Sequence, residues 1–201
     1  MTTPTPDPEP TYADRVFRSP AGLVAGVLLL ALVAWLGGDA LFRGEGRARA
    51  MGLALLLLGV PLIVAFTLRP AVFAGEDRLR IRNPFRTITL PWAAVKTLSA
   101  IYSVEVFTQQ DAKYQMWAVP VSLRARKRAS ARQALAGDDA SRGADVRRAP
   151  ADQTVAELRE LAERGASRPG AQGEPQVRWA YEIIAPAAVG AVVVAVLLAT
   201  G

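Results

Sequence analysis

The 201-residue sequence contains no cysteine and no histidine. The lack of cysteine excludes disulfide bonds, thiolate nucleophiles and cysteine-based metal sites. The lack of histidine removes the most frequent general base near neutral pH and the most frequent metal ligand. The polar part of the chain also has no GxSxG motif, no Walker loop, no GxGxxG motif and no spaced pair of carboxylates. We therefore expect no enzymatic activity, no bound metal and no cofactor.

The chain has an uneven distribution of apolar and charged residues. Hydrophobic residues make up 51% of it and charged residues 21%, and the mean hydropathy is +0.20. This combination indicates that the two kinds of residue occupy separate segments. The formal net charge of +6 comes mostly from arginine and would favour anionic lipid or nucleic acid as a partner.

Three apolar segments predict three transmembrane helices, over residues 20–42, 50–68 and 183–200. About 20 apolar residues in a helix span the ~30 Å hydrocarbon core of a bilayer. The first segment could instead be a signal peptide, but its apolar run is too long and a second run follows almost at once. Gly22 and Gly26 form a weak small-xxx-small signal for helix packing. Trp179 and Tyr181 are expected to anchor the third helix at the membrane interface.

Arginines near these segments predict the orientation in the membrane. Nine lie on the side shared by the N-terminus and the central segment: Arg15, Arg18, Arg69, Arg78, Arg80, Arg82, Arg164, Arg168 and Arg178. The loop between the first two helices holds three: Arg43, Arg47 and Arg49. The positive-inside rule then places the N-terminus and the central segment in the cytoplasm, and the C-terminus outside the plasma membrane.

The central segment, residues 69–165, is predicted to form a small antiparallel sheet. Residues 78–82 and 87–90 alternate between polar and apolar side chains and are separated by Asn83-Pro84, which indicates a β-hairpin. Further strand-like runs cover residues 95–98, 104–108 and 114–121, so we expect a meander of about five short strands.

An amphipathic helix over residues 152–164 is expected to cover this sheet. Its apolar face consists of Val155, Leu158, Leu161 and Ala162. Thr154 and Glu157 fit a capping box at its start, and Gly165 is a stop signal. The predicted fold class is thus an α+β membrane protein: three transmembrane helices and a small antiparallel sheet with one C-terminal helix.

Three segments are expected to lack packed structure because they have few large apolar side chains: a disordered tail at 1–19, a flexible insertion at 124–150 and a linker at 166–180.

Three runs of the central segment are distinctive: Arg69-Pro70-Ala71-Val72-Phe73, Leu79 to Arg86 with its Asn-Pro turn, and Ile88-Thr89-Leu90-Pro91-Trp92. Through these runs the segment resembles the bacterial PH-like domain family of actinobacterial membrane proteins. Val155 to Arg159 is similar to the family's C-terminal helix. The resemblance implies a membrane-tethered PH-like fold, and it implies no catalytic residue.

Four arginines on or beside the predicted hairpin are the candidate site for an anionic lipid head group or an acidic partner: Arg78, Arg80, Arg82 and Arg86. The alternative interpretation is a solvated strand face that follows the positive-inside rule. A second basic cluster contains Arg124, Arg126, Lys127, Arg128 and Arg132. It has no interleaved aromatic residues, so we do not expect nucleic-acid binding.

Two functions remain open at this stage. One is a membrane-anchored binding or scaffold module that recruits a protein, a peptide or an anionic lipid to the inner face of the membrane. The other is a structural or regulatory subunit of a larger membrane complex for transport or envelope maintenance, in which another membrane protein is the partner.

The acidic residues near helix ends, Asp39 and Glu182, are expected to be interfacial and not part of an ion pathway.

Overall fold

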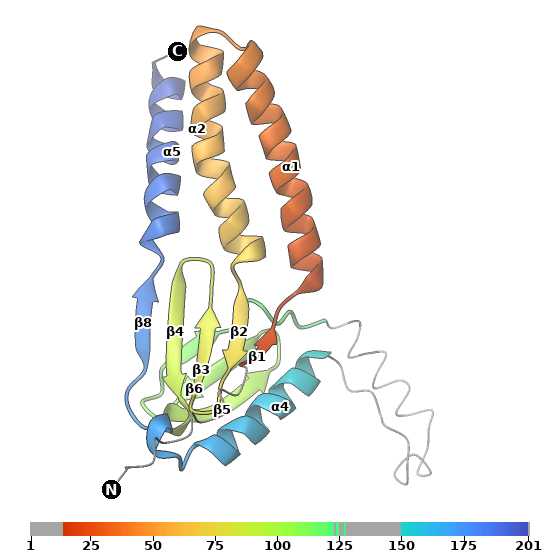
Figure 1. Cartoon of the computed structure of the whole chain (residues 1–201), viewed down its shortest axis with the longest axis vertical. Coiled ribbons are helices and arrows are strands. Elements are labelled where there is room, and N and C mark those ends of the chain that lie inside the picture. Colours follow the sequence, from red (N-terminus) through yellow and green to blue (C-terminus); the bar gives the residue numbers. More distant parts are fainter. Residues whose placement is uncertain (1–13, 123, 125–126, 128–149, 201) are drawn as a thin grey trace, which may run out of the picture.

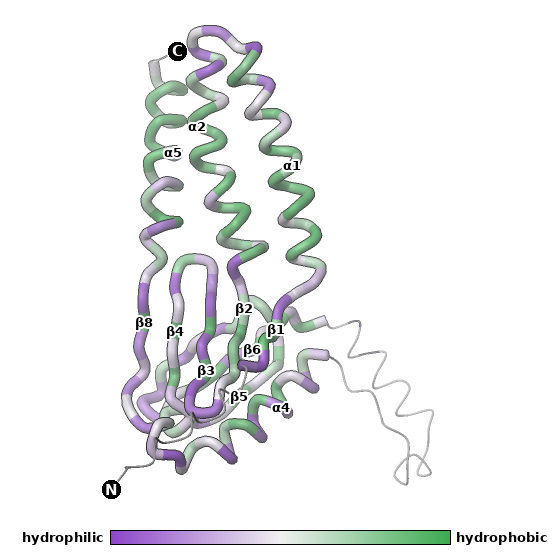
Figure 2. Tube along the Cα trace, viewed as in Figure 1, coloured by the Kyte–Doolittle hydropathy of each residue, from purple (hydrophilic) through white to green (hydrophobic). Residues whose placement is uncertain are grey.

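The computed structural model describes residues 14–122, 124, 127 and 150–200. Three long helices stand side by side at one end of an elongated molecule, and a β-rich domain with one further helix forms the other end (Figure 1). The helices are α1 (Pro20–Arg43), α2 (Gly46–Ile63) and α5 (Tyr181–Ala199), and a π-helical turn, η1 (Val64–Leu68), extends α2. All three are long and apolar enough to cross a membrane, and Figure 2 shows their hydrophobic character. The architecture is α+β, with three helices that could span a membrane.

The start of α1 follows directly from its sequence. The Ser19 side chain accepts a hydrogen bond from the Gly22 backbone N–H (3.2 Å), and Pro20 occupies the first turn, where its missing N–H costs nothing. Outward-facing side chains on this helix are large and apolar; Leu28, for example, is 65% exposed. Such a surface is stable next to lipid and unfavourable in water.

Small residues allow the three helices to pack closely. A side chain at Gly26 would overlap Thr67 and Leu68 of η1, and one at Gly190 in α5 would overlap the backbone of α2 near Leu58. Gly22 has ordinary space around it, so only one member of the predicted pair is needed for packing.

The first two helices are joined more tightly than the sequence indicated. Only Gly44 and Glu45 separate them, and α2 begins at Gly46 instead of residue 50. Arg47 therefore lies in the first turn of α2, where its guanidinium donates to the carbonyl oxygen of Leu197 near the end of α5. This contact satisfies a carbonyl that has no partner within its own helix.

The β domain consists of two antiparallel sheets. The five-stranded sheet has the order β1-β2-β3-β4-β8, and the three-stranded sheet has the order β5-β6-β7. The strands are β1 (Arg15–Phe17), β2 (Ala71–Ala74), β3 (Arg78–Arg82), β4 (Arg86–Pro91), β5 (Val95–Ala100), β6 (Val104–Thr108), β7 (Lys113–Gln115) and β8 (Gln176–Trp179). The predicted hairpin is confirmed, with Ile81 opposite Ile88 in β3 and β4.

Two of the predicted unstructured segments in fact contribute strands. The predicted disordered tail contains β1, in which Val16 pairs with Phe73, and the predicted linker contains β8, in which Val177 pairs with Ile88. Both strands are short and lie at the edges of the sheet. Their backbone partners come from distant parts of the chain. Short edge strands of this kind have too few residues for their alternation to be read locally. The predicted strand at 114–121 was too long, because β7 ends at Gln115.

The core of the domain lies between the two sheets and helix α4 (Pro150–Gly165). It is built by fully buried residues of four elements: Leu79, Ile81, Ile88, Leu90, Val104, Val106 and Leu158. The predicted helical cover is thereby confirmed, and its Val155 and Leu158 are buried as expected.

The predicted capping box is wrong, because the helix starts by Pro150 and the Thr154 hydroxyl donates to the Pro150 carbonyl from inside the first turns. Trp92 is buried and donates its indole N–H to the Gly75 carbonyl (3.0 Å).

The domain is attached to the helices by packing as well as by the chain. Phe85, in the turn between β3 and β4, packs against Ala65 of η1 and Ile183 of α5. Its ring also makes an edge-to-face contact with Phe66 (centroids 5.3 Å apart), and its carbonyl accepts a hydrogen bond from the Ala180 N–H. The tip of the hairpin is thus held between the ends of two candidate membrane helices.

Candidate anion-binding groove

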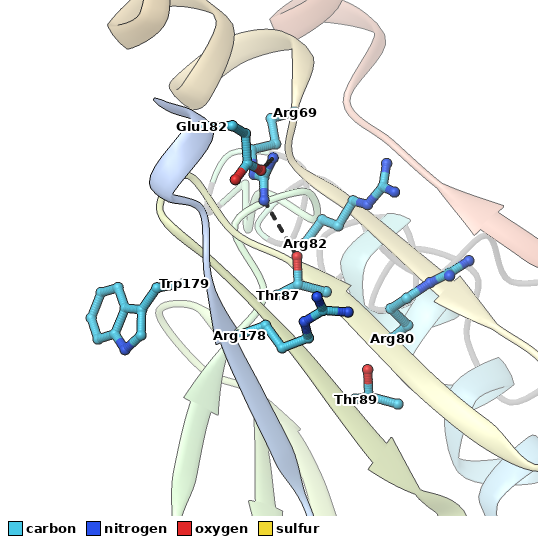
Figure 3. A pocket seen from close by; sticks show the side chains of 8 residues that line it. All are labelled: Arg69, Arg80, Arg82, Thr87, Thr89, Arg178, Trp179 and Glu182. Carbon is cyan, nitrogen blue, oxygen red and sulfur yellow. Dashed lines mark hydrogen bonds and ion pairs between the residues drawn. The ribbon is translucent and has the colours of Figure 1, made fainter. Parts of the chain in front are cut away.

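The outer face of the five-stranded sheet carries a groove where the sheet meets the helices. Alternation along β3 and β4 turns Leu79, Ile81, Ile88 and Leu90 into the core, so the residues between them point outward. The groove has a volume of about 340 Å³ (Figure 3). Its lining residues are Arg69, Arg80, Arg82, Thr87, Thr89, Arg178, Trp179 and Glu182.

Strand register brings the arginines of β3 and β8 to the same place. Arg82 pairs with Thr87, which in turn pairs with Arg178, so a threonine hydroxyl lies between two guanidinium-bearing positions. Arg69 reaches the same point from the end of η1 and donates to the Thr87 hydroxyl (3.4 Å). The groove therefore combines residues that follow η1, residues of the β3–β4 hairpin, and residues of β8 and α5, which lie far from the other two groups in the sequence (Figure 3).

Three arginine side chains lie near the ring of Phe73 in β2, beside the groove. The guanidinium carbons of Arg80, Arg82 and Arg18 lie 4.7, 5.2 and 5.9 Å from the centroid of its ring. A cation over an aromatic face is stabilised by about 0.5–1 kcal/mol at an exposed site. This ring can thus offset part of the repulsion among three like charges.

Acidic partners neutralise only part of this charge. Arg69 forms an ion pair with Glu182 (2.9 Å), and Arg80 forms one with Asp14 (3.3 Å). Within the described part of the chain, no carboxylate lies within ion-pair distance of Arg82 or Arg178.

Hydrogen bonding shows the same imbalance. The Nε–H group of Arg80 is buried and has no acceptor among the described residues. A buried donor without a partner is unfavourable, and an arginine offers donors only. The groove thus has more donors than acceptors, which is the arrangement expected for a site that receives an anion.

The pKa of Arg82 shows the positive potential of the site. Burial lowers this pKa below its ordinary value, and the charges of Arg80, Arg69 and Arg18 lower it further, whereas the carboxylate of Glu182 offsets a smaller part of the shift. Arginine remains protonated in spite of such a shift. The charged form of Arg82 is therefore less stable than in water, and an anion bound beside it would relieve that cost.

The structure brings together only two of the four arginines that the sequence singled out. Arg80 and Arg82 line the groove, whereas Arg78 lies at the far end of β3 and does not line it. Arg86 lies on the opposite face of the sheet, where its guanidinium stands 5.8 Å from the centroid of the Tyr114 ring. The reason is that Arg86 has the same strand parity as the core residue Ile88.

Sequence reasoning missed two cations and one acid of the groove. The sequence indicates only flanking charges at Arg69 and Arg178, and only an interfacial residue at Glu182. The weak signal for Arg178 was the alternation of polar and apolar residues in Gln176-Val177-Arg178-Trp179. The indole of Trp179 projects away from the arginines in Figure 3, and the residue is 54% exposed.

The remaining sequence candidates lie apart from the groove. Asp39 forms an ion pair with Arg43 within α1 (3.2 Å). The second basic cluster lies outside the described residues except for Arg124 and Lys127, which are exposed, and most of the predicted insertion 124–150 lies outside them as well. Among the residues that the structure describes, no group of three potential metal ligands comes together.

Comparison with known proteins agrees with the fold of the central segment. Residues 69–164 match the family described as bacterial PH domain, which covers slightly less than half of the chain. No curated protein and no solved structure matches the sequence. The matched residues include β2 to β7 and α4, whereas β1 and β8 lie outside them. The chain thus contains a PH-like domain whose sheet is completed by strands from both flanking segments.

Proposed function

With a PH-like domain fixed to three membrane-length helices as the premise, we propose that this protein is a membrane-anchored binding module. Its groove holds the phosphate of an anionic lipid head group at the inner face of the plasma membrane. The single observation that carries the proposal is the pair Arg82 and Arg178, two guanidinium groups that share one groove. In the described part of the chain neither forms an ion pair, and the one carboxylate that lines the groove, Glu182, is paired with Arg69. PH-like domains generally bind a ligand or a partner and do not catalyse reactions, which agrees with this role.

The position of the groove favours a lipid over a freely diffusing anion. Arg69 directly follows η1, and Glu182 lies in the first turn of α5, so one wall of the groove is formed at the ends of two candidate membrane helices. A lipid beside these helices would present its head group at the height of the groove. The positive-inside rule gives the cytoplasmic leaflet, which is the leaflet rich in anionic lipid.

The chemistry of the groove suits a phosphodiester. Guanidinium groups donate two parallel hydrogen bonds to phosphate oxygens, and the Thr87 hydroxyl can add a further donor. A basic residue near an anionic membrane surface contributes about 1 kcal/mol. Two unpaired arginines would therefore give a modest affinity, which is sufficient for a lipid that is already concentrated in the membrane.

The test uses the full chain purified in a neutral detergent and titrated with short-chain phosphatidylglycerol. A ligand that binds the folded state raises the melting temperature, and the increase grows with ligand concentration. We expect phosphatidylglycerol to raise it and phosphatidylcholine of the same chain length to leave it unchanged. The variants Arg82→Gln and Arg178→Gln should each lose most of the increase.

Arg78→Gln is the matched control. It removes the same charge from the same strand but lies outside the groove. If this variant loses as much of the increase as Arg82→Gln, the effect is a general response to charge and the proposal is wrong. An equal effect of inorganic phosphate would show that the site binds free anions and not lipid. Higher salt should weaken binding, because exposed charges are screened over ~8 Å at physiological ionic strength.

A further inference from the structure

A set of exposed apolar and aromatic residues lies apart from the arginine groove. Tyr102 is 85% exposed, Ile101 is 62% exposed and Trp117 is 50% exposed. The first two form the tip of the loop between β5 and β6, and Trp117 follows β7. Three large side chains of this kind need an apolar or interfacial partner, because exposure of such area to water is unfavourable.

A ring contact and hydrogen bonds place this set at the end of the domain that meets the helices. The Trp117 ring lies 5.6 Å, centroid to centroid, from the ring of Phe66 in η1, which belongs to a candidate membrane span. The Trp117 N–H donates to Asn83 Oδ1 (3.3 Å) in the turn between β3 and β4. Trp117 therefore packs against the end of a candidate membrane helix.

The loop tip is linked to the same end through β6. The Met116 N–H donates to the Val104 carbonyl (2.8 Å), and Val104 pairs with Ala100 to close the loop. Ile101 and Tyr102 thus lie three and two residues before Val104, which is hydrogen-bonded to Met116, the residue next to Trp117. The loop itself, Ile101 to Ser103, carries no charge.

We propose that the β5–β6 loop and Trp117 insert into the interfacial layer of the bilayer, so that the lipid surface itself is the partner of this end of the domain. Tryptophan and tyrosine prefer the head-group region, where the ring is apolar and the polar atom remains hydrated. Ile101 would enter the acyl boundary beside them. This contact would fix the orientation of the domain on the membrane. It does not depend on the arginine groove, because it needs no anionic lipid.

The absence of native cysteine allows a direct test. The full chain carrying Tyr102→Cys is labelled with the environment-sensitive fluorophore NBD and reconstituted into phosphatidylcholine vesicles. Gln110→Cys is the control, since this exposed residue lies in the β6–β7 turn at the opposite end of β6. We expect the label at residue 102 to emit at shorter wavelength and to be quenched by phosphatidylcholine with a spin label near the head group. The label at residue 110 should show neither effect.

The variant is expected to fold, because a side chain that is 85% exposed makes few contacts. Ile101→Cys provides a second, independent position for the same measurement. Equal emission and equal lack of quenching at residues 101, 102 and 110 would overturn the proposal. A shift to shorter wavelength without quenching by lipid would also overturn it, because the loop would then be covered by a protein, such as a second copy of this chain.

Discussion

Helix α4 offers a quantitative test of what holds the PH-like domain together. Leu158 lies in the middle of the helix with 0% exposure and packs into the core that the two sheets share. The next residue, Arg159, donates through its guanidinium to the Leu98 carbonyl of β5 (Nε–O 3.2 Å), so the helix is bound to the three-stranded sheet at this point. Removing the Leu158 side chain should therefore weaken the whole domain.

The magnitude follows from the burial. A fully buried leucine changed to alanine costs about 2–5 kcal/mol through lost transfer energy and an unfilled cavity. Since 1.4 kcal/mol corresponds to a factor of ten, amide hydrogen exchange in α4 and β5 should accelerate roughly 30- to 4000-fold if it occurs by unfolding of the domain. Leu158→Asp should be still more damaging, because it would bury a carboxylate without a partner.

Hydrogen exchange of the full chain in detergent, read by mass spectrometry, is the suitable assay because it reports on the domain separately from the helices. Gln153→Ala is the control on the exposed face of the same helix. We expect little change for Gln153→Ala, since a surface substitution usually stays within about 0.5 kcal/mol. If Leu158→Ala and Gln153→Ala give the same exchange rates in β5, the helix does not stabilise the sheet and the reasoning from burial is refuted.

Three further predictions concern other parts of the molecule. Gly26→Leu should destabilise the helix bundle by about 1–3 kcal/mol because the side chain would overlap η1, whereas Gly38→Leu, which has open space around it, should be tolerated; thermal unfolding in detergent compares them. The pKa of Glu105 lies below its ordinary value because neighbouring serine and lysine side chains donate hydrogen bonds to its carboxylate. Its contribution to stability should be present above the ordinary glutamate pKa of about 4.3 and be lost as the pH falls through the lower folded-state pKa, so Glu105→Gln should cost stability at pH 7 and progressively less as the pH falls below that ordinary value. For the topology, a cysteine at Gln110 should be protected from a membrane-impermeant thiol reagent in intact cells, and one added after Gly201 should react; the reverse pattern would contradict the positive-inside assignment.

The groove illustrates why a site is harder to predict than the elements that carry it. Arg80 and Arg82 could be found because they alternate with buried residues on one strand. Arg86 lies on the other face because it shares the parity of Ile88 and Leu90, so the alternation along β4 already separates it from Arg80 and Arg82. Arg178 could not be placed until β8 had been paired with β4.

The sequence by itself determined the three membrane-length helices, the β3–β4 hairpin and the amphipathic helix α4. Each depends on a periodic or continuous pattern within elements of 5 to 24 residues, and such patterns record which face of an element is buried. The strands β2, β5 and β6 are also visible at this level, although their grouping into two sheets is not.

Only the tertiary structure decided that the segments before α1 and before α5 complete the five-stranded sheet. The strands β1 and β8 have three and four residues, and their partners in the sheet are 55 or more positions away in the chain. Their stability comes from backbone pairing along an existing edge, which leaves almost no trace in local composition. The same long-range pairing brings Arg178 beside Arg82 and thereby creates the groove. The groove could not be predicted locally because strand register is a property of two paired segments and cannot be read from either one alone.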